Sequence, residues 1–316
     1  MGKVNKKLVS FVIPCYGSEK TIEFVVKEIK QAFKDAEDYD FEVIAVNDCS
    51  PDKVWDVLKA LAEKDKRIKP IHLSKNMNRP GAVMAGLNNV HGDYVCVMDD
   101  DGQCPMDRFW DLLKPLEEGY DVSLADYPER KQSAFKDFGT FVNKKMTEYM
   151  LDRPKELQFT NFMILKRYIA DEVCKYKNPY PYMTGLVLRI TRNICCVKMD
   201  ERERYTGTSN FTFKKMVSLW MNGLTAFSIK PLRLASVIGT LIAFIGFIYG
   251  LVIIGTKIFG TKNILAGYSS MMAIILFTNG IIMLLLGLIG EYLGRIYMCI
   301  NNSPQYVIKE RINFDD

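Results

Sequence analysis

The sequence predicts an α/β domain built on a mostly parallel sheet, followed by interfacial helices and a hairpin of two membrane-spanning helices. In the first part of the chain, short apolar runs alternate with amphipathic segments, as in βαβ units whose sheet is covered on both faces. Polar motifs follow three of the first four apolar runs. Beyond Arg233 the sequence becomes strongly apolar, so the mean hydropathy of -0.02 averages two unlike regions.

The elements of the first domain follow from two periodicities. β-branched and apolar runs predict strands, whereas apolar residues that recur every three or four positions predict helices. The expected strands are residues 8–13, 41–46, 68–73 and 94–98, and the helices between them are 22–33, 54–64 and 81–90. The middle of the chain is less regular, with helices expected at 112–116 and 135–150 and strands at 121–125 and 190–197.

The organising stretch is residues 94–105, YVCVMDDDGQCP. Its apolar run leads directly into Asp99, Asp100 and Asp101, with Gln103 two residues later, at the carboxyl end of an expected strand. Adjacent carboxylates repel one another, so they call for a cation or for hydrogen-bond donors. Oxygen ligands suit Mg²⁺ or Mn²⁺, and Mg²⁺ completes its shell with water and substrate phosphates. The stretch is either a metal-diphosphate site or an acidic, solvated turn.

Composition narrows the possible partners and the compartment. The net charge of +5 is a modest excess that does not imply nucleic acid, and the sequence shows no basic and aromatic recognition pattern. His72 and His91 are the two histidines, which argues against a zinc site. The eight cysteines form no CxxC pair and are expected to be buried thiols in a reducing compartment. The start lacks a signal-peptide core, so we expect the first domain on the cytosolic side.

Residues 209–233 differ from the preceding domain. Phe211, Phe213 and Trp220 belong to an apolar and aromatic surface that also contains Lys214 and Lys215. Such a segment suits a helix that lies in the membrane interface with its cations near lipid headgroups. An ordinary amphipathic helix of a soluble core is the alternative.

Two apolar stretches follow this segment. Residues 234–256 hold 23 positions without a charge, which makes about 34 Å of helix, enough to cross the hydrocarbon. Residues 269–289 hold 21 more, and this second span can extend to residue 298. Basic residues before the first span and after the second predict that both chain ends are cytoplasmic. A buried hairpin in a soluble protein is the alternative. Gly239, Gly246 and Gly250 suit packing within the hairpin or a homo-oligomer equally well.

An acidic metal turn in a cytosolic domain that is tethered to a membrane hairpin indicates a soluble activated donor and a lipid acceptor. A nucleotide diphosphate sugar fits the donor, because a metal ion would bridge its two phosphates and stabilise the charge on the leaving nucleotide.

Seven motifs carry a resemblance to a known family. They are VIPCYGSE at 12–19, VNDCSPD at 46–52, LSKNMNRPGAVMAGL at 73–87, MDDDGQCP at 98–105, RYTGTS at 204–209, FSIKPLRL at 227–234 and IGEYLGRIY at 289–297. Each motif is weak by itself, but together they are specific and cover nearly the whole chain. With them the sequence resembles the polyprenyl-phosphate glycosyltransferases of the GT-A fold, a group that includes dolichyl-phosphate mannose synthase and the bacterial bactoprenol glucosyltransferases with two transmembrane helices.

The resemblance implies roles for the residues at matching positions. Asp99, Asp101 and Gln103 would hold the Mg²⁺ or Mn²⁺ ion. The nucleotide sugar would be bound by Pro14, Tyr16, Glu19, Asp48, Arg79, Asp99 and Asp100. Of these, Asp48 would read the base or the ribose, and a solvated surface arginine is the alternative for Arg79. The acceptor phosphate would be bound by Arg130, Lys131, Arg204 and Ser209. The positions assigned to catalysis are Asp101, Arg204 and Asn161.

The chain departs from the family pattern at three places. Asn161 stands where many relatives have an aspartate that is sometimes proposed as a base, and Asn210 stands where relatives often have a lysine. Gly102 replaces the usual leucine and is expected to loosen the metal turn. The missing base is tolerable because a phosphate monoester, with a second pKa near 6, is largely dianionic at neutral pH and is itself a competent nucleophile.

The sequence therefore predicts an inverting, metal-dependent glycosyltransferase that moves a hexose from a nucleotide sugar, UDP-glucose or a related UDP-sugar, to undecaprenyl or another polyprenyl phosphate. The expected parts are a catalytic domain at 1–208, juxtamembrane helices at 209–233, two spans within 234–298 and a cytosolic tail at 299–316. The protein would sit in the inner or plasma membrane with both termini cytoplasmic. A processive polysaccharide synthase and a non-catalytic scaffold of the same fold are the rival interpretations.

Overall fold

The computed structural model describes residues 6–127, 159–179, 181–202 and 267–314, together with positions 148, 154 and 157 and several between 232 and 248. The chain divides into two compact units. The first is Met1–Asn222 together with Asn302–Asp316, and the second is Gly223–Asn301. The helix expected at 135–150, nearly all of the interfacial segment and most of the first span lie outside the described residues.

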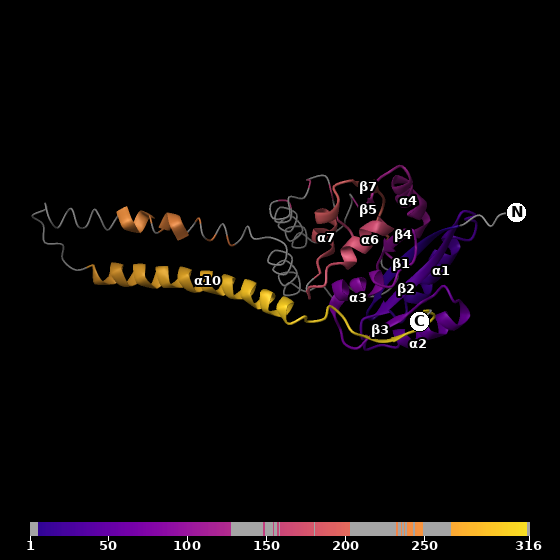
Figure 1. Cartoon of the computed structure of the whole chain (residues 1–316), viewed down its shortest axis with the longest axis horizontal. Helices are drawn as coiled ribbons and strands as arrows, with labels where there is room; N and C mark the ends of the chain where they lie inside the picture. Colours follow the sequence, from indigo (N-terminus) through magenta and orange to yellow (C-terminus); the bar gives the residue numbers. More distant parts are fainter. Residues whose placement is uncertain are drawn as a thin grey trace, which may run out of the picture. The chain divides into compact units, whose positions relative to one another are not determined.

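A single mixed sheet forms the centre of the first unit (Figure 1). In the described part of the chain its order is β7-β5-β6-β4-β1-β2-β3-β8. The strands are β1 (Lys7–Cys15), β2 (Tyr39–Asn47), β3 (Ile71–Leu73), β4 (Tyr94–Val97), β5 (Val122–Asp126), β6 (Met163–Lys166), β7 (Ile194–Lys198) and β8 (Ile308–Arg311). β1 pairs in parallel with both β2 and β4, and β2 pairs in parallel with β3. β5 and β7 also pair in parallel, whereas β6 and β8 are antiparallel to their neighbours. Parallel pairs are the majority, so the expected mostly parallel α/β sheet is confirmed.

Helices cover both faces of this sheet. The helices of the first unit are α1 (Ile22–Ala32), α2 (Val54–Lys64), α3 (Asn78–Leu87), α4 (Phe109–Glu117), α6 (Arg167–Cys174) and α7 (Met183–Ile190), with a 3₁₀ turn, η1, at Met106–Arg108. α1, α2 and α4 share a core with Val9, Phe11 and Ile13, the alternate residues of β1 that point to one face. α3 packs against β1 and β2 from the other face and contacts α6.

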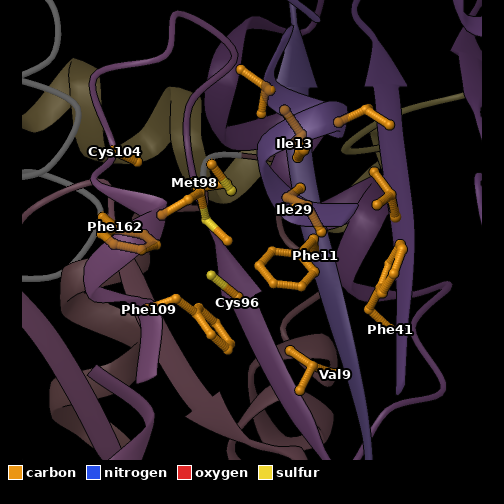
Figure 2. Close-up of a cluster of buried hydrophobic side chains, with 14 of the residues drawn as sticks. Val9, Phe11, Ile13, Ile29, Phe41, Cys96, Met98, Cys104, Phe109 and Phe162 are labelled. Atoms are coloured by element: carbon orange, nitrogen blue, oxygen red, sulfur yellow. The ribbon is translucent and has the colours of Figure 1, made fainter. Parts of the chain in front are cut away.

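The core beneath the first face is aromatic (Figure 2). Phe11, Phe41, Phe109 and Phe162 are fully buried, and the ring centroids of Phe11 and Phe109 lie 5.2 Å apart. Truncating a buried phenylalanine to alanine costs about 3–5 kcal/mol of stability. These rings therefore fix the strands whose carboxyl ends carry the predicted site.

The second unit contains one long apolar helix, α10 (Tyr268–Ile300), of 33 residues. Within the described residues, Phe277–Ile300 is the one stretch long and apolar enough to cross a membrane, and Gly239–Ile248 is a shorter apolar helix. Phe277, Met283 and Ile300 are 68%, 72% and 72% exposed, so the surface of α10 is strongly apolar. The predicted second span, residues 269–289, lies inside this helix.

The last residues return to the first unit. β8 pairs antiparallel with β3, with Ile71 opposite Arg311 and Leu73 opposite Ile308. The sequence predicted a tail here but no strand, because Ile308–Arg311 has charged residues where a half-buried strand would alternate.

Several element boundaries differ from expectation. α3 begins at Asn78 rather than at residue 81, because Pro80 falls in the first helical turn, where its missing N–H leaves no helical hydrogen bond unmade. β3 begins at Ile71, and Ile68 forms only an isolated bridge with Val43. Ile190 ends α7 and does not start a strand.

Candidate active site

The loops after β1, β2 and β4 meet at one edge of the sheet because these strands are neighbours. The backbone N–H of Tyr16 donates to Asp100 Oδ2 at 3.1 Å, which joins the first loop to the acidic turn. Gly17 N–H donates to Ser50 Oγ at 2.8 Å and Glu19 N–H to Asp52 Oδ2 at 2.9 Å, which joins the first loop to the second. The three polar motifs therefore form one continuous surface at the carboxyl ends of the strands.

Asp48 directly follows β2 and is buried beneath this surface, at 3% exposed. Its Oδ1 accepts a 2.6 Å hydrogen bond from the backbone N–H of Met77. Burial raises the pKa of Asp48 to about 6, and hydrogen bonds from the Met77 and Asn78 backbones offset only part of that effect. The carboxylate is thus held where burial disfavours its charge.

Asp99 is held by two side chains from distant parts of the sequence. Arg79 Nε donates to its Oδ1 at 2.8 Å, and Asn161 Nδ2 donates to its Oδ2 at 2.6 Å. In the described part of the chain, Nη2 of Arg79 is buried without a hydrogen-bond partner. A phosphate oxygen is the kind of group that satisfies such a nitrogen. Arg79 is therefore part of the acidic cluster, in an ion pair with Asp99.

The acidic turn is anchored at both ends. Met98 and Cys104 flank it and are 1% and 4% exposed. Burial raises the pKa of Asp100 to about 6, and the neighbouring charges of Asp99 and Asp101 add to that rise. Gln103 N–H donates to Asp101 Oδ1 at 3.1 Å, which closes the turn.

Gly102, the residue between these two, has a φ of 78°. Glycine adopts this conformation without the steric cost that a leucine would meet. This conformation argues against the expectation that Gly102 loosens the metal turn, because the turn needs a positive φ that glycine adopts easily.

The remaining donor-site candidates border this turn. Pro14 lies inside β1, opposite Val46 of β2. Tyr16 is 53% exposed beside the acidic turn. Glu19 Oε2 accepts a 3.3 Å hydrogen bond from Lys53 N–H and so braces the loops after β1 and β2.

Arg202 is a site-bordering residue that the sequence analysis missed. Its backbone N–H donates to Gln103 O at 3.2 Å, and its carbonyl accepts from Gln103 Nε2 at 3.2 Å. Its guanidinium pairs with Glu28 at 2.6 Å and with Asp107 at 2.5 Å. The one available signal was its place two residues before Arg204. The four acceptor-site candidates, Arg130, Lys131, Arg204 and Ser209, lie outside the described residues.

The donor atoms of the turn fit a hard divalent cation in kind. Asp99, Asp101 and Gln103 offer carboxylate and amide oxygens, the ligands that Mg²⁺ and Mn²⁺ prefer. Among the described residues, no group of three or more His, Cys, Asp or Glu side chains is placed to hold a metal ion. Such a turn suits a cation that takes its other ligands from water and from a bound diphosphate.

Comparison with known proteins decides the family. The model of "Glycosyl transferase family 2" matches residues 10–174, and that of the "GtrB C-terminal hairpin" matches residues 230–296. The chain belongs to glycosyl transferase family 2. It is 31% identical over 308 residues to the uncharacterized glycosyltransferase YkcC of Bacillus subtilis, covering 97% of this chain and 95% of the relative.

Other relatives of this family 2 glycosyltransferase have names that state a substrate. The SfII prophage-derived bactoprenol glucosyl transferase of Shigella flexneri is 31% identical over 310 residues, covering 96% of this chain and 97% of the relative. The undecaprenyl-phosphate 4-deoxy-4-formamido-L-arabinose transferase of Photorhabdus laumondii is 29% identical, covering 96% of this chain and 94% of the relative.

Solved structures show the same fold in its first unit. Glucosyl-3-phosphoglycerate synthase from Mycobacterium tuberculosis, solved with Mn²⁺, UDP-glucose and phosphoglyceric acid, superposes with a TM-score of 0.51 at 17% identity. The match covers 70% of this chain and 78% of that one. Mannosyl-3-phosphoglycerate synthase from Rubrobacter xylanophilus gives a TM-score of 0.52 at 18% identity, covering 72% and 74%. The GT-A type of fold expected from the sequence is confirmed.

Proposed function

We propose that this glycosyltransferase moves a hexose from a UDP-sugar, with UDP-glucose as the leading candidate, to undecaprenyl phosphate or a similar polyprenyl phosphate. The observation that carries the proposal is the cluster of Asp48, Asp99, Asp100 and Asp101 with Arg79, on a chain that continues into a long apolar helix. The names of the bactoprenol and undecaprenyl-phosphate relatives support the acceptor. The UDP-glucose complex of the structural relative supports the donor.

Different donor-site residues bind different parts of the nucleotide sugar. Asp48 accepts a hydrogen bond from the base or the ribose, and Arg79 offers its unpartnered Nη2 to a phosphate oxygen. Asp99, Asp101 and Gln103 would hold Mg²⁺ or Mn²⁺, which when bound supplies positive charge against the departing diphosphate. The Mn²⁺ complex of the structural relative supports a divalent ion here.

The acceptor needs no protein base. An oxygen of the lipid phosphate dianion attacks the anomeric carbon, and the bond from that carbon to the UDP oxygen breaks with its electron pair leaving on UDP. Attack from the face opposite the leaving group inverts the sugar. Asn161 is neutral and donates to Asp99, so its role is to hold that carboxylate. Arg204, Ser209, Arg130 and Lys131 are proposed to position and screen the acceptor phosphate.

The proposed location is a bacterial inner or plasma membrane, with α10 and the segment at 234–256 as its two spans and both termini cytoplasmic. The apolar surface of α10 and the match to the hairpin model support this arrangement. The domain limits at 208, 233 and 298 remain our proposal, as does a homo-oligomer packed through the glycines of the first span.

Transfer of radiolabelled sugar to undecaprenyl phosphate by the purified full chain tests this function. The donors are UDP-glucose, UDP-N-acetylglucosamine, UDP-galactose and GDP-mannose, each with Mn²⁺, with Mg²⁺ or with EDTA. We expect a metal-dependent, chloroform-extractable product from one UDP-sugar. A water-soluble polymer would indicate a processive synthase instead, and no product from any donor would contradict the proposal.

A further inference from the structure

The C-terminal tail, residues 302–314, is bound along the first unit by side-chain and backbone contacts. Gln305 is its most deeply anchored residue at 7% exposed. The Nε2 of Gln305 donates to the carbonyls of Tyr176 at 2.7 Å and Asn178 at 2.6 Å. Both carbonyls lie in the connection between α6 and α7, so one side chain fastens the tail to the middle of the domain.

The same part of the tail contacts residues 74–81, which run from the end of β3 into the first turn of α3 and are called the donor loop below. Ser74 N–H donates to Val307 O at 2.9 Å. A Cβ added to Gly81 would lie 3.1 Å from the carbonyl oxygen of Gln305 and 2.6 Å from Met77 Cβ. The tail carbonyl thus lies against Gly81, although the closest obstacle to a side chain there is Met77 of the donor loop itself.

The opposite side of the donor loop carries two contacts to the candidate active site. Met77 N–H binds Asp48, and Arg79 binds Asp99. Asn78, between them, has a φ of 59°, a left-handed conformation that asparagine adopts more readily than most residues. Here the active-site carboxylates hold one side of the donor loop and the tail holds the other.

We propose that the tail is a positioning element for the nucleotide sugar, in which Gln305 fixes the donor loop so that Met77 and Arg79 stay aligned with Asp48 and Asp99. This inference rests on the proposed function, because it takes residues 74–81 as part of the nucleotide-sugar site. Gln305 touches no substrate and acts through the loop.

The chain offers a matched control on the same tail. Asn313 also donates its amide to two backbone carbonyls, those of Ala62 at 2.9 Å and Ile68 at 2.8 Å. These carbonyls belong to α2 and the connection to β3, not to the donor loop. Asn313 has a φ of 64°, so Asn313→Gly removes the amide without adding backbone strain.

The experiment compares full-length Gln305→Ala, Gly81→Ala and Asn313→Gly. Gly81→Ala presses on Met77 and, less closely, on the Gln305 carbonyl while the tail's hydrogen bonds remain, so it tests whether a displaced donor loop lowers UDP affinity. UDP affinity is measured by calorimetry with and without Mn²⁺, together with Tm and with kcat and KM for both substrates. We expect UDP affinity and donor KM to worsen about 5- to 10-fold in the first two variants, with kcat and lipid KM within about twofold. Asn313→Gly should lower Tm but leave UDP affinity unchanged.

Equal loss of UDP affinity in Gln305→Ala and Asn313→Gly would overturn the inference, because the tail would then only support the fold. Unchanged affinity in both Gln305→Ala and Gly81→Ala would overturn it as well. If the unaltered protein binds UDP but glycosylates no lipid, the proposed acceptor fails, and the variant affinities still decide the role of the tail. Binding of neither UDP nor GDP by the unaltered protein would overturn both.

Discussion

Buried carboxylates lie near both ends of the parallel strands, but their pKa values are shifted in opposite directions. Near the amino ends, Glu42 is buried, with one oxygen bound by Ser10 Oγ at 2.6 Å and His91 N–H at 2.7 Å and the other by Lys69 Nζ at 2.8 Å. Burial alone would raise its pKa, but these partners outweigh burial and lower the pKa. At the carboxyl ends, burial raises the pKa of Asp48 and of Asp100 to about 6.

The difference lies in the number of donors that each carboxylate receives. Glu42 has a cation and two hydrogen bonds from within the domain, so its charge is compensated by the protein itself. Asp48 receives two backbone hydrogen bonds, the Ser18 side chain and a backbone N–H stabilise the charge of Asp100, and no cation is among the causes of their pKa shifts. The protein itself compensates the negative charge of Glu42. The carboxylates at the carboxyl ends are stabilised further when a ligand brings positive charge or hydrogen-bond donors.

The largest expected effect comes from removing a carboxylate at the carboxyl ends. Asp101→Ala should lower kcat/KM by about 10³-fold, roughly 4 kcal/mol, because the charge that holds a metal against the diphosphate is lost. The Tm of Asp101→Ala in EDTA should stay close to that of the unaltered protein. Radiolabel transfer and thermal melting measure the two quantities, with Asp111→Ala on the exposed face of α4 as the control. Full turnover in Asp101→Ala would contradict the metal hypothesis.

Removing the carboxylate of Glu42, near the amino ends, should lower stability and leave ligand binding intact. Glu42→Gln should lower the free energy of unfolding by about 2–3 kcal/mol, since Lys69 is left without its partner. UDP affinity should be unchanged. Urea unfolding and calorimetry measure the two, and a Glu42→Gln, Lys69→Met double variant should regain part of the stability. A large loss of UDP affinity would show that the two clusters are not independent.

Ionisation of Asp48 and of Glu42 changes the stability of the fold in opposite directions, which a pH series can measure. The pKa of Asp48 is higher in the folded chain, near 6, than the usual 3.8, so its ionisation destabilises the fold as pH rises from about 4 to about 6. Asp48→Asn should therefore gain about 1–2 kcal/mol relative to the unaltered protein across that window. The pKa of Glu42 is lowered, so its contribution is present above 4.5 and is lost as pH falls through the folded value.

Glu42→Gln should accordingly cost less stability at pH 3.5 than at pH 7. Urea unfolding of both variants in EDTA at several pH values tests the pair of signs. Parallel pH slopes in the two variants would refute the comparison.

The smallest expected effect concerns the geometry of a single cation. Arg79→Lys keeps the charge beside Asp99 but loses the guanidinium fork that includes the unpartnered Nη2. Donor KM should rise about fivefold with kcat little changed. Arg108→Lys, in an exposed pair with Asp111, is the matched control and should change neither. Equal donor KM in both variants would indicate that Arg79 is a solvated surface arginine and does not bind the donor.

The acidic turn was predictable because its signal is local. An apolar run that ends in three aspartates marks a strand and its carboxyl end, and the structure places β4 at Tyr94–Val97, before Asp99. The pairing of Arg79 with Asp99 was not predictable, since periodicity placed the start of the helix at residue 81 and gives no information on where the side chain of Arg79 points. β8 was missed for a related reason: edge strands are short and charged, and their pairing depends on a partner far along the chain.

The pairing of β3 with β8 sets an order of assembly during synthesis. β3 is a strand of three residues, and its neighbour on the outer side is the last strand of the chain. Roughly 240 residues separate the two, which take about 10 to 50 s to synthesise at ordinary rates. During that time the ribosome makes the apolar helix α10, and the sheet still lacks its final strand. The sheet of the first unit is therefore completed only after the apolar helix has been made.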